Sequence, residues 1–410
     1  MNEIRNIPTL RFSDFTESWK KRKLKEFSTF FSGGTPTSTI KKFYNGSIPF
    51  IKSGEINSTE TKQFLSEEGL NNSSAKRVSK GDLLYALYGA TSGEVGISKI
   101  DGAINQAVLC IRGDFNNNLL ANYLRKEKNK IVSTYLQGGQ GNLSADIIKN
   151  LKLFLPSLSE QQKIADFLTT VDKRIELLEK KKTLLETYKK GVMKKIFNQE
   201  IRFKDDNGND FPDWVKYRMG EIIDVLSDYT ANGSFGGLKE NVQYYTELNF
   251  AALVRTTDLE KKQFNPQRFT DQRGYDYLSK TSLFGGELIM ANVGSIGKIY
   301  KCPEYHLPMT LAPNTYMIKF KKDLIDEGFI FQLMKRKTFE NKLLSMVGSS
   351  TLKAINKKNL RSIEVNIPCK DEQLKLNQFL SSIDNQIDLL ETQIEKSKTW
   401  KKGLLQKMFV

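Results

Sequence analysis

The sequence predicts an α+β protein in which two globular α/β domains are separated by two long, repeated helices. These helices form an antiparallel coiled coil, and the whole has a pseudo-twofold, near-cyclic arrangement. Three observations predict this fold. The stretch 159–197 returns as 371–409 without a gap. Both copies carry apolar residues at alternating steps of three and four, as in a coiled-coil seam. Strand-like runs separated by turn residues precede each copy.

The internal repeat is carried by several short motifs that keep one constant offset. They are Glu160-Gln161-x-Lys163 with Glu372-Gln373-x-Lys375, Leu177-Leu178-Glu179 with Leu389-Leu390-Glu391, Lys189-Lys190-Gly191 with Lys401-Lys402-Gly403, and Phe197 with Phe409. Repetition at a fixed period is the mark of a duplicated architecture. The sequence therefore predicts two copies of one helical element.

The expected seam has apolar positions in both copies: Ile164, Leu168, Val171, Ile175, Leu178, Leu185, Val192 and Ile196, then Leu376, Leu380, Ile383, Ile387, Leu390, Ile394, Leu404 and Met408. It has four polar defects: Lys182, Lys189, Ser397 and Lys401. Thirty-odd helical residues at about 1.5 Å each predict a rod of roughly 55 Å. The alternative is a pair of ordinary core helices, which seldom keep such spacing.

Each helix has a predicted start. Ser159 with Gln162 has the spacing of a capping box, and Asp371 is a good N-cap by itself. Pro156 and Pro368 are expected to end the preceding segments.

The repeat extends beyond the helices, because each half opens with an Arg-Phe segment and a tryptophan: Arg11-Phe12 with Trp19, and Arg202-Phe203 with Trp214. The predicted domains are 1–157 (first globule), 158–198 (first helix), 199–369 (second globule) and 370–410 (second helix). Since Phe197 is followed at once by 201–203, we expect Phe409 to lie near Arg11 and Phe12. The chain is therefore predicted to be nearly cyclic.

Within the first globule, strands are predicted at 48–51, 82–87 and 107–111, and a helix at 119–136. The second globule repeats these signals at 286–289 and 316–318, with a helix at about 325–344. Elsewhere the globules diverge. A shared scaffold with different loops is what two domains that recognise two different targets would need.

The composition points to an anionic partner. The 410 residues carry a formal net charge of +16, and both halves are basic, so nucleic acid is the first candidate. A merely soluble basic protein remains an alternative. Cys110, Cys302 and Cys369 lack the spacing of a zinc site or a disulfide framework. The N-terminal residues lack the apolar region of a signal peptide, and no run approaches a membrane span, so we expect a cytoplasmic protein.

No catalytic site is evident in the sequence. The only histidine, His306, has no second histidine to form a metal site or an acid–base pair. The segment 294–298 resembles a phosphate loop, but its glycine spacing is wrong and Ile299 replaces the required Ser/Thr. The segment 265–268 lacks the second proline and the aromatic residue of an amino-methyltransferase motif. The chain is therefore predicted to bind rather than catalyse.

Loops rich in glycine and small polar residues recur at matched places in both halves. Glycine allows backbone to approach a duplex, Asn and Gln pair with adenine, Arg and Lys pair with guanine, and hydroxyls contact phosphates. The alternative is that these are ordinary turns. The candidate DNA-binding residues are Lys52, Tyr88, Thr91, Ser92, Asn105, Gln137, Gln140, Asn142, Asn232, Ser234, Arg255, Asn292, Ser295, Lys298, Asn314, Ser349, Thr351 and Lys353.

The order of globules and helices, the paired Glu-Gln-x-Lys motifs and the paired Lys-Lys-Gly-x-x-x-Lys-x-Phe ends together resemble one known family across essentially the whole chain. It is the family of DNA-specificity (S) subunits of Type I restriction-modification systems. The single motifs are weak, but the duplicated set is specific. Base-contacting residues diverge within the family and are not carried over.

The resemblance implies a subunit without catalytic activity and with two target-recognition domains, each reading half of an asymmetric, bipartite DNA sequence. The helices would set the number of unread bases and dock two modification (methyltransferase) subunits, with two restriction subunits able to join. S-adenosylmethionine, ATP and Mg²⁺ would belong to those partners. The candidate partner-binding residues are Leu178, Lys190, Gly191, Phe197, Leu390, Lys402, Gly403 and Phe409.

The two helical glycines, Gly191 and Gly403, cost about 1 kcal/mol each relative to alanine, so we expect close approach by a facing helix or a partner there. Half-site centres about 34 Å apart, one duplex turn, are within reach of the predicted rods. The alternative function is a basic coiled-coil scaffold that binds RNA or protein partners. A nuclease that acts alone is the least supported reading.

Overall fold

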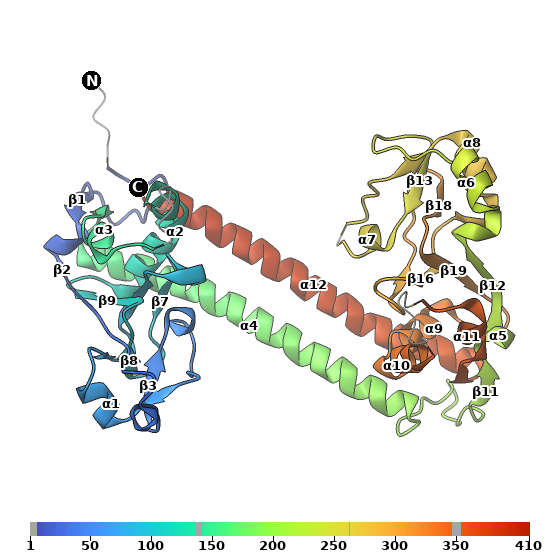
Figure 1. Ribbon diagram of the computed structural model, residues 1–410, viewed down its shortest axis with the longest axis horizontal. Coiled ribbons are helices and arrows are strands. Elements are labelled where there is room, and N and C mark those ends of the chain that lie inside the picture. Colours follow the sequence, from blue (N-terminus) through green and yellow to red (C-terminus); the bar gives the residue numbers. More distant parts are fainter. Residues whose placement is uncertain (1–5, 136–141, 262, 347–353) are drawn as a thin grey trace. The chain divides into compact units, whose positions relative to one another are not determined.

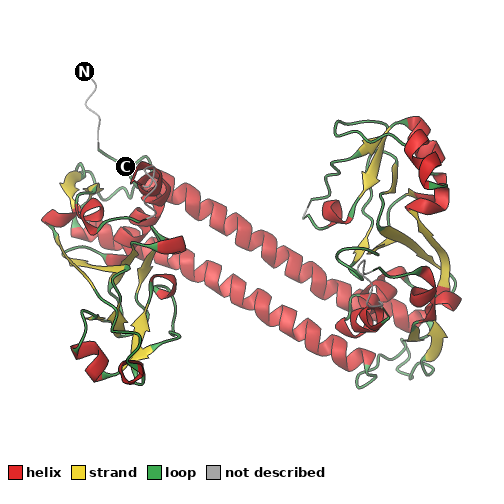
Figure 2. Ribbon diagram, in the orientation of Figure 1, coloured by secondary structure: helices red, strands yellow, loops and turns green. Residues whose placement is uncertain are grey.

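The computed structural model describes residues 6–135, 142–261, 263–346 and 354–410. The chain divides into two compact units, Met1–Lys182 with Leu390–Val410 (unit 1) and Thr183–Leu389 (unit 2). Two long helices, α4 (Leu158–Phe197) and α12 (Lys370–Met408), each contribute residues to both units (Figures 1 and 2).

The remaining elements of unit 1 are strands β1 (Lys20–Lys23), β2 (Ser28–Ser32), β3 (Ile48–Ile51), β4 (Phe64–Leu65), β5 (Lys76–Val78), β6 (Leu83–Ala86), β7 (Val95–Ile97), β8 (Gly102–Ile104), β9 (Val108–Gly113) and β10 (Lys152–Leu155). Its short helices are η1 (Leu24–Glu26), η2 (Lys41–Tyr44), η3 (Ser53–Glu55), α1 (Glu67–Asn71), η4 (Gly89–Thr91), α2 (Asn117–Tyr135) and α3 (Ala145–Lys149).

Unit 2 has strands β11 (Val215–Arg218), β12 (Ile223–Asp228), β13 (Ala251–Val254), β14 (Phe269–Thr270), β15 (Ser282–Leu283), β16 (Leu288–Ala291), β17 (Ile299–Lys301), β18 (Met309–Leu311), β19 (Thr315–Phe320) and β20 (Glu364–Ile367). Its short helices are α5 (Met219–Ile222), η5 (Tyr229–Asn232), α6 (Phe235–Asn241), α7 (Thr256–Leu259), α8 (Gln272–Tyr277), η6 (Ser279–Thr281), α9 (Glu327–Met334), α10 (Lys337–Ser345) and α11 (Lys357–Ser362).

The two units have the same strand topology. Unit 1 contains sheets of order β2-β9-β6-β7 and β4-β3-β8-β5 and a β1-β10 pair, and unit 2 contains β12-β19-β16-β17, β14-β13-β18-β15 and β11-β20. In both units one pair is parallel, β3 with β8 and β13 with β18, and the other pairs are antiparallel. The duplicated α+β architecture predicted from the sequence is confirmed, as are the predicted strands.

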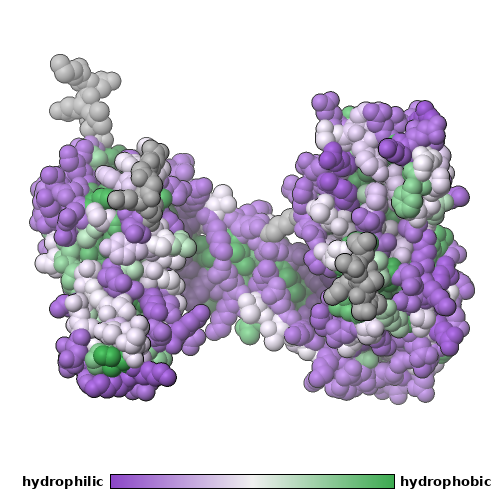
Figure 3. Space-filling model, viewed as in Figure 1, coloured by the Kyte–Doolittle hydropathy of each residue, from purple (hydrophilic) through white to green (hydrophobic). Residues whose placement is uncertain are grey.

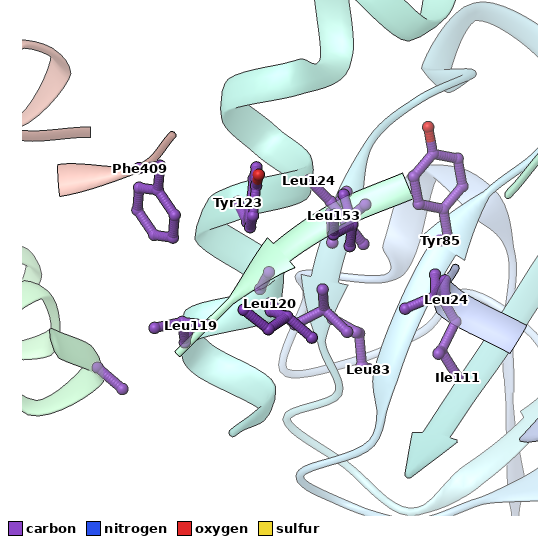
Figure 4. Packing of buried hydrophobic residues seen from close by; sticks show 14 of the residues in the cluster. Leu24, Leu83, Tyr85, Ile111, Leu119, Leu120, Tyr123, Leu124, Leu153 and Phe409 are labelled. Atoms are coloured by element: carbon purple, nitrogen blue, oxygen red, sulfur yellow. The ribbon is translucent and has the colours of Figure 1, made fainter. Parts of the chain in front are cut away.

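The core of unit 1 follows from the apolar runs. All four residues of β6 are buried because both faces of this central strand are covered. The side chains of Leu120 and Leu124 on α2 pack on Leu83 of β6 and Leu153 of β10 (Figure 4). The hydroxyl of the buried Tyr85 has no hydrogen-bond partner among the described residues.

The helix pairing is antiparallel in each unit. In unit 1, Asp172, Glu179 and Lys182 on α4 form ion pairs with Lys401, Lys398 and Glu391 on α12, so the partner number falls as the α4 number rises. In unit 2, Lys189 pairs with Asp384. The predicted apolar seam is buried or half-buried throughout. Three of its four polar defects, Lys182, Lys189 and Lys401, are thus cations paired with the opposite helix.

The repeated Glu-Gln pair fastens each helix to its globule. Gln161 Nε2 donates to the Pro156 carbonyl at 3.1 Å, and Gln161 Oε1 accepts from the Asn116 amide at 3.0 Å. Gln373 makes the same two bonds in unit 2, to Pro368 at 2.9 Å and from Asp326 at 2.8 Å. The motif is therefore structural.

The predicted N-caps of the long helices, Ser159 and Asp371, lie inside the helices and not before them. The first helix starts at Leu158, and Ser157 Oγ, rather than Ser159, accepts from the Glu160 amide at 3.4 Å. The second starts at Lys370, one residue before Asp371. The glutamine bonds back to Pro156 and Pro368 fix each first turn directly after the proline, which sequence capping rules do not consider.

The helix predicted at 325–344 is broken into α9 and α10. Arg336 has an extended backbone, with φ −68° and ψ 140°, and its guanidinium lies 4.4 Å from the centre of the Phe197 ring. This tertiary contact, which periodicity does not encode, accompanies the break.

The near-cyclic arrangement is confirmed by one hydrogen bond that occurs in both units. Leu10 N donates to Lys407 O at 2.9 Å, and Ile201 N donates to Lys195 O at 3.4 Å, although Ile201 follows its helix directly and Leu10 does not. Among the described residues, no helix combines the length and apolar character that a membrane crossing requires.

Candidate nucleic-acid interface

Three connections meet at one end of a sheet in unit 1. The Leu87 carbonyl accepts from the Leu143 amide at 2.9 Å and from Ser92 Oγ at 2.9 Å, and Leu87 N donates to Ala107 O at 2.8 Å. The β6–β7 and β8–β9 connections and the segment before α3 are thereby joined. Because β6 and β9 are antiparallel, with Ala86 opposite Val108, the end of one and the start of the other share an edge.

Unit 2 repeats this convergence. Asn292 N donates to Asn314 O at 3.2 Å, and Ile355 N donates to Asn292 O at 3.1 Å. The β16–β17 and β18–β19 connections and the segment before α11 are therefore joined as in unit 1. We call each set of three connections a loop cluster. It contains residues 87–94, 105–107 and 142–143 in unit 1, and 292–298, 312–314 and 354–355 in unit 2.

The candidates of unit 1 lie in or beside its loop cluster. Tyr88, Thr91 and Ser92 are half-buried in the β6–β7 connection. The Asn105 carboxamide accepts from the Ala107 amide at 3.2 Å, which supports its own turn. Asn142 is exposed next to the Leu143 contact.

Lys52 and Arg255 occupy equivalent positions, directly after β3 and β13. The exposed Lys52 precedes η3, which packs beside η4. Arg255 differs because its guanidinium donates to both carboxylate oxygens of the buried Asp258, at 2.9 and 2.7 Å. The hydrogen bond to Asp258 raises the pKa of Arg255, and with the charge of that carboxylate it outweighs burial, which lowers it. The guanidinium donors of Arg255 that could pair with a base are thus already bound to Asp258.

Two further candidates of unit 2 serve the fold. The Asn232 amide donates to Tyr229 O and Thr281 Oγ1, and its oxygen accepts from Lys280 N. Ser234 caps α6 by accepting from Gly237 N at 3.2 Å. Both amide donors of Asn232 and one acceptor position of its oxygen are therefore used within the fold.

The β16–β17 connection presents Ser295 and Lys298, both exposed. Lys298 Nζ donates to Glu260 at 2.9 Å, and Tyr300 donates to the same oxygen at 2.7 Å. These two hydrogen bonds, with the lysine charge, lower the pKa of Glu260. Asn314 is exposed and has a positive φ of 67°, which asparagine tolerates better than most residues.

Five candidates fall outside the described residues. They are Gln137, Gln140, Ser349, Thr351 and Lys353. Each belongs to a segment that adjoins the loop cluster of its unit in sequence.

The candidate partner-binding residues divide into buried and exposed groups. Leu390 is buried and Leu178 half-buried in the seam, whereas their neighbours Leu389 and Leu177 are 59% and 65% exposed. Lys190 and Lys402 are exposed.

The terminal phenylalanines of the motif pack internally. Phe409 is 3% exposed, with its ring centre 4.9 Å from that of Tyr123 and 6.2 Å from that of Trp19 (Figure 4). Phe197 packs on Trp214 and Phe329 at 6.1 and 5.7 Å. These rings join helix to globule. Phe409 has almost no exposed surface for a partner, whereas Phe197 is half-buried.

The glycines do not mark a close approach by the facing helix. A Cβ added to Gly191 or Gly403 would meet no described heavy atom of the chain within 4 Å. That part of the sequence prediction is wrong, because the seam side of each helix carries the apolar residues and the glycines lie off it.

Sequence reasoning missed exposed aromatic residues near the unit 2 loop cluster. Phe235 is 83% and Tyr244 is 50% exposed. Phe235 stands inside the loop Asn232-Gly233-Ser234-Phe235, of which only the polar members were chosen. An aromatic residue within a Gly/Ser-rich loop is the signal that could have found it.

The described residues contain no group of three or more His, Cys, Asp or Glu side chains that could hold a metal ion. His306 is exposed, and its ring is tilted against that of Tyr305 with ring centres 4.2 Å apart. On the face in Figure 3, hydrophilic residues cover most of each unit.

Comparison with known proteins is consistent across sequence and structure. The family described as the Type I restriction modification DNA specificity domain matches residues 16–187 and 212–397. Two curated relatives from Methanocaldococcus jannaschii, the Type I restriction enzyme MjaVIII specificity subunit and the putative type I restriction enzyme MjaX specificity subunit, are each 24% identical. The alignments cover 93% and 96% of this chain and 90% and 94% of those proteins.

Two solved structures share the fold. The S subunit of a Type I restriction-modification system from M. genitalium has a TM-score of 0.60 at 15% identity, covering 98% of this chain and 99% of that one. A chain from a structure of type I R-M complex assembly and conformational transition has a TM-score of 0.55 at 15% identity, with 95% and 97% covered.

The two family matches fall on the two halves that the strand topology shows to be equivalent, and together they span most of the sequence. The chain therefore belongs to the Type I restriction modification DNA specificity domain family.

Proposed function

We propose that this chain is the DNA sequence-specificity subunit of a Type I restriction-modification complex, and that each unit reads one half of an asymmetric, bipartite target. The observation that carries the proposal is the pair of loop clusters. They are built by equivalent connections on the same strand topology and held by equivalent backbone hydrogen bonds, yet they present different side chains. One scaffold used twice with different loops suits two different half-sites.

The charge supports a nucleic-acid partner. A net charge of +16 favours association with a polyanion, because each phosphate neutralised releases condensed counterions. Of the candidates at or beside the loop clusters, Lys298 is exposed but paired with Glu260, whereas Lys52, Asn142, Ser295 and Asn314 are exposed. We assign direct contacts with DNA to these rather than to Arg255 or Asn232.

Catalysis is assigned to partner subunits. Relatives that match nearly the whole chain are named specificity subunits. We propose that two modification subunits, and in some assemblies two restriction subunits, supply the chemistry. S-adenosylmethionine, ATP and Mg²⁺ would bind to them.

The long helices are proposed to dock the modification subunits and to set the number of unread base pairs. Matched residues on their outer faces support docking: Leu177 and Leu389 are exposed, as are Tyr188 and Trp400 at 53% and 52%. Exposed apolar side chains that recur at equivalent positions are typical of interaction surfaces. The open space at Gly191 and Gly403 would let a partner approach the backbone closely.

Methylation mapping tests the proposal. Genomic DNA from cells that express this chain with its modification subunit would be compared with DNA from cells that lack only this chain. We expect a methylated bipartite motif that disappears without the chain. If the complex assembles but no chain-dependent motif exists, the specificity role fails, and a scaffold that binds RNA or protein becomes the better account.

A further inference from the structure

Unit 2 contains an open pocket of about 480 Å³ beside its loop cluster. Its walls come from the segment between β12 and β13 and from two loop-cluster connections. The lining residues that matter here are Tyr229, Phe235, Lys239, Tyr244, Asn292 and Asn314, with Leu238 and Val242 as an apolar floor. The volume lies within the range of pockets that hold small organic groups.

The aromatic residues of this pocket are held in place by the fold. Phe235 is the first residue of α6, whose start is fixed by the Ser234 cap. The Tyr244 hydroxyl donates to the hydroxyl of the buried Tyr229 at 2.8 Å. Because the Phe235 ring is 83% exposed on a fixed helix end, most of its surface is available to a group bound in the pocket.

The charges of the pocket favour a phosphate. In the described part of the chain Lys239 forms no ion pair, and it is exposed. The carboxylate in the pocket, Asp228, is offset by Lys357 at 3.0 Å and accepts hydrogen bonds from Thr230 and Ala231. A lysine next to aromatic rings is the combination that binds phosphates and bases of single-stranded nucleic acid, so a base of duplex DNA reaches this pocket by leaving its stack.

We propose that this pocket receives one nucleotide of the target DNA, with its base against Phe235 and Tyr244 and a phosphate near Lys239. The inference rests on the proposed function and deepens it, because it names residues that specify part of one half-site. Asn292 and Asn314 connect the pocket to the loop cluster, so a nucleotide in the pocket is continuous with DNA on that surface.

The corresponding pocket of unit 1 has a different chemistry. It has a volume of about 390 Å³ and is lined by the connection between β2 and β3 and by Lys52, but by no residue of the loop cluster; the lining includes Thr35, Lys41, Tyr44 and Asn45. The Tyr44 hydroxyl is engaged by the Pro36 carbonyl at 2.6 Å. This lining has two lysines and a single aromatic residue, whereas the pocket of unit 2 has three aromatic residues, so we assign the aromatic contact to the half-site read by unit 2.

The test uses the full chain assembled with its modification subunit and compares Phe235→Ala, Phe235→Leu and Lys239→Ala with wild type. Phe284→Ala is the matched control, because Phe284 is a 72% exposed aromatic of the same unit outside the pocket. Each complex is measured for affinity to a duplex carrying the mapped motif and for its methylation motif in cells.

We expect Phe235→Ala to weaken specific binding by about 5- to 150-fold and to relax one position in a single half-site, since stacking of one base on an aromatic ring contributes a factor of that size. Phe235→Leu should keep part of the affinity but relax the same position. Lys239→Ala should weaken all duplexes alike and reduce the salt dependence by about one phosphate. Phe284→Ala should match wild type.

Unchanged affinity and motif in Phe235→Ala, while wild type still methylates a bipartite motif, would overturn the pocket assignment and leave the proposed function intact. A Phe235→Ala chain that keeps DNA affinity but no longer assembles with the modification subunit would also overturn it, in favour of a protein-docking pocket. A wild-type chain that directs no motif would instead contradict the proposed function itself.

Discussion

Arg11 and Glu160 form a bidentate ion pair, with Nε to Oε1 at 2.7 Å and Nη2 to Oε2 at 2.7 Å. Glu160 is 1% exposed and also accepts from the Trp19 indole at 3.3 Å. Unit 2 repeats the arrangement with Arg202, Trp214 and Glu372. The first residues of each globule are thus tied to the first turn of its own long helix.

Glu160→Gln should destabilise unit 1 by about 3 kcal/mol, because the half-buried Arg11 guanidinium loses the buried carboxylate that compensates its charge. Chemical denaturation followed by tryptophan fluorescence measures the loss. Glu176→Gln, on the exposed face of the same helix, is the control and should stay within about 0.5 kcal/mol of wild type. Equal effects for the two variants would show that the buried pair has no special role.

Gln199→Gly should stabilise unit 2 by about 0.5–1 kcal/mol. Gln199 has a φ of 61° just after α4, and its amide and that of Glu200 donate back to Ile196 O and Lys195 O, each at 2.9 Å. This helix end favours glycine because a Cβ is strained there. Thermal denaturation compares the melting temperatures of Gln199→Gly, the control Gln199→Ala and the wild type. No advantage of glycine over alanine would refute the strain.

The two buried thiols, Cys110 and Cys302, should lower the free energy of unfolding at alkaline pH. Burial, aided by Asp82, raises the pKa of Cys110 to about 12, and burial, aided by Glu287, raises that of Cys302 to about 12. In the unfolded chain a thiol titrates near pH 8.5. The contribution of each buried thiol to the free energy of unfolding is therefore fully present below that pH and falls as the pH rises above it. The expected slope is about 1.4 kcal/mol per pH unit for each thiol.

Thiol labelling at pH 8 provides the readout for single sites. Cys369, which is half-buried, should react in the folded protein, whereas Cys110 and Cys302 should react only on unfolding. Cys110→Ser and Cys302→Ser should each reduce the alkaline slope. Rapid labelling of all three thiols under native conditions would contradict the burial argument.

A circularly permuted chain should keep its target. In unit 2, two residues, Gln199 and Glu200, connect Asn198 to Ile201. Val410 corresponds to Asn198 and Leu10 to Ile201 in unit 1. A two-residue linker from Val410 to Leu10, with the chain opened between Gln199 and Glu200, should therefore preserve the methylation motif. Opening the chain inside the buried strand β9 is the control and should prevent folding. A folded permutant that no longer bound its DNA target specifically would contradict the near-cyclic arrangement.

The sequence was sufficient for the long helices, because burial in a helix pair follows the three-four spacing directly. It did not reveal that Lys189 pairs with Asp384 or Lys401 with Asp172, since those partners lie 195 and 229 positions away. From the sequence alone, these lysines at seam positions therefore predicted weaker packing between the helices. The same limit explains the helix break at Arg336, which accompanies a contact with Phe197.

The candidate site was predicted in outline only. Recurring Gly- and Asn-rich loops do meet at the loop clusters, because equivalent strands bring equivalent connections together. The loop sequences do not show which side chains form hydrogen bonds within the fold. Arg255 is bound to Asp258, and Asn232 supports its own turn. Phe235 was missed because exposure is a property of the folded chain.

The most direct test of the two-unit account is methylation mapping with a chain in which the second globule, residues 201–367, is replaced by the first, residues 10–155. Both natural long helices are kept. The account predicts a folded complex that methylates a bipartite motif with the first half-site present twice, in inverted orientation. If a folded, assembled complex kept the original asymmetric motif, the claim that each unit reads its own half-site would be contradicted.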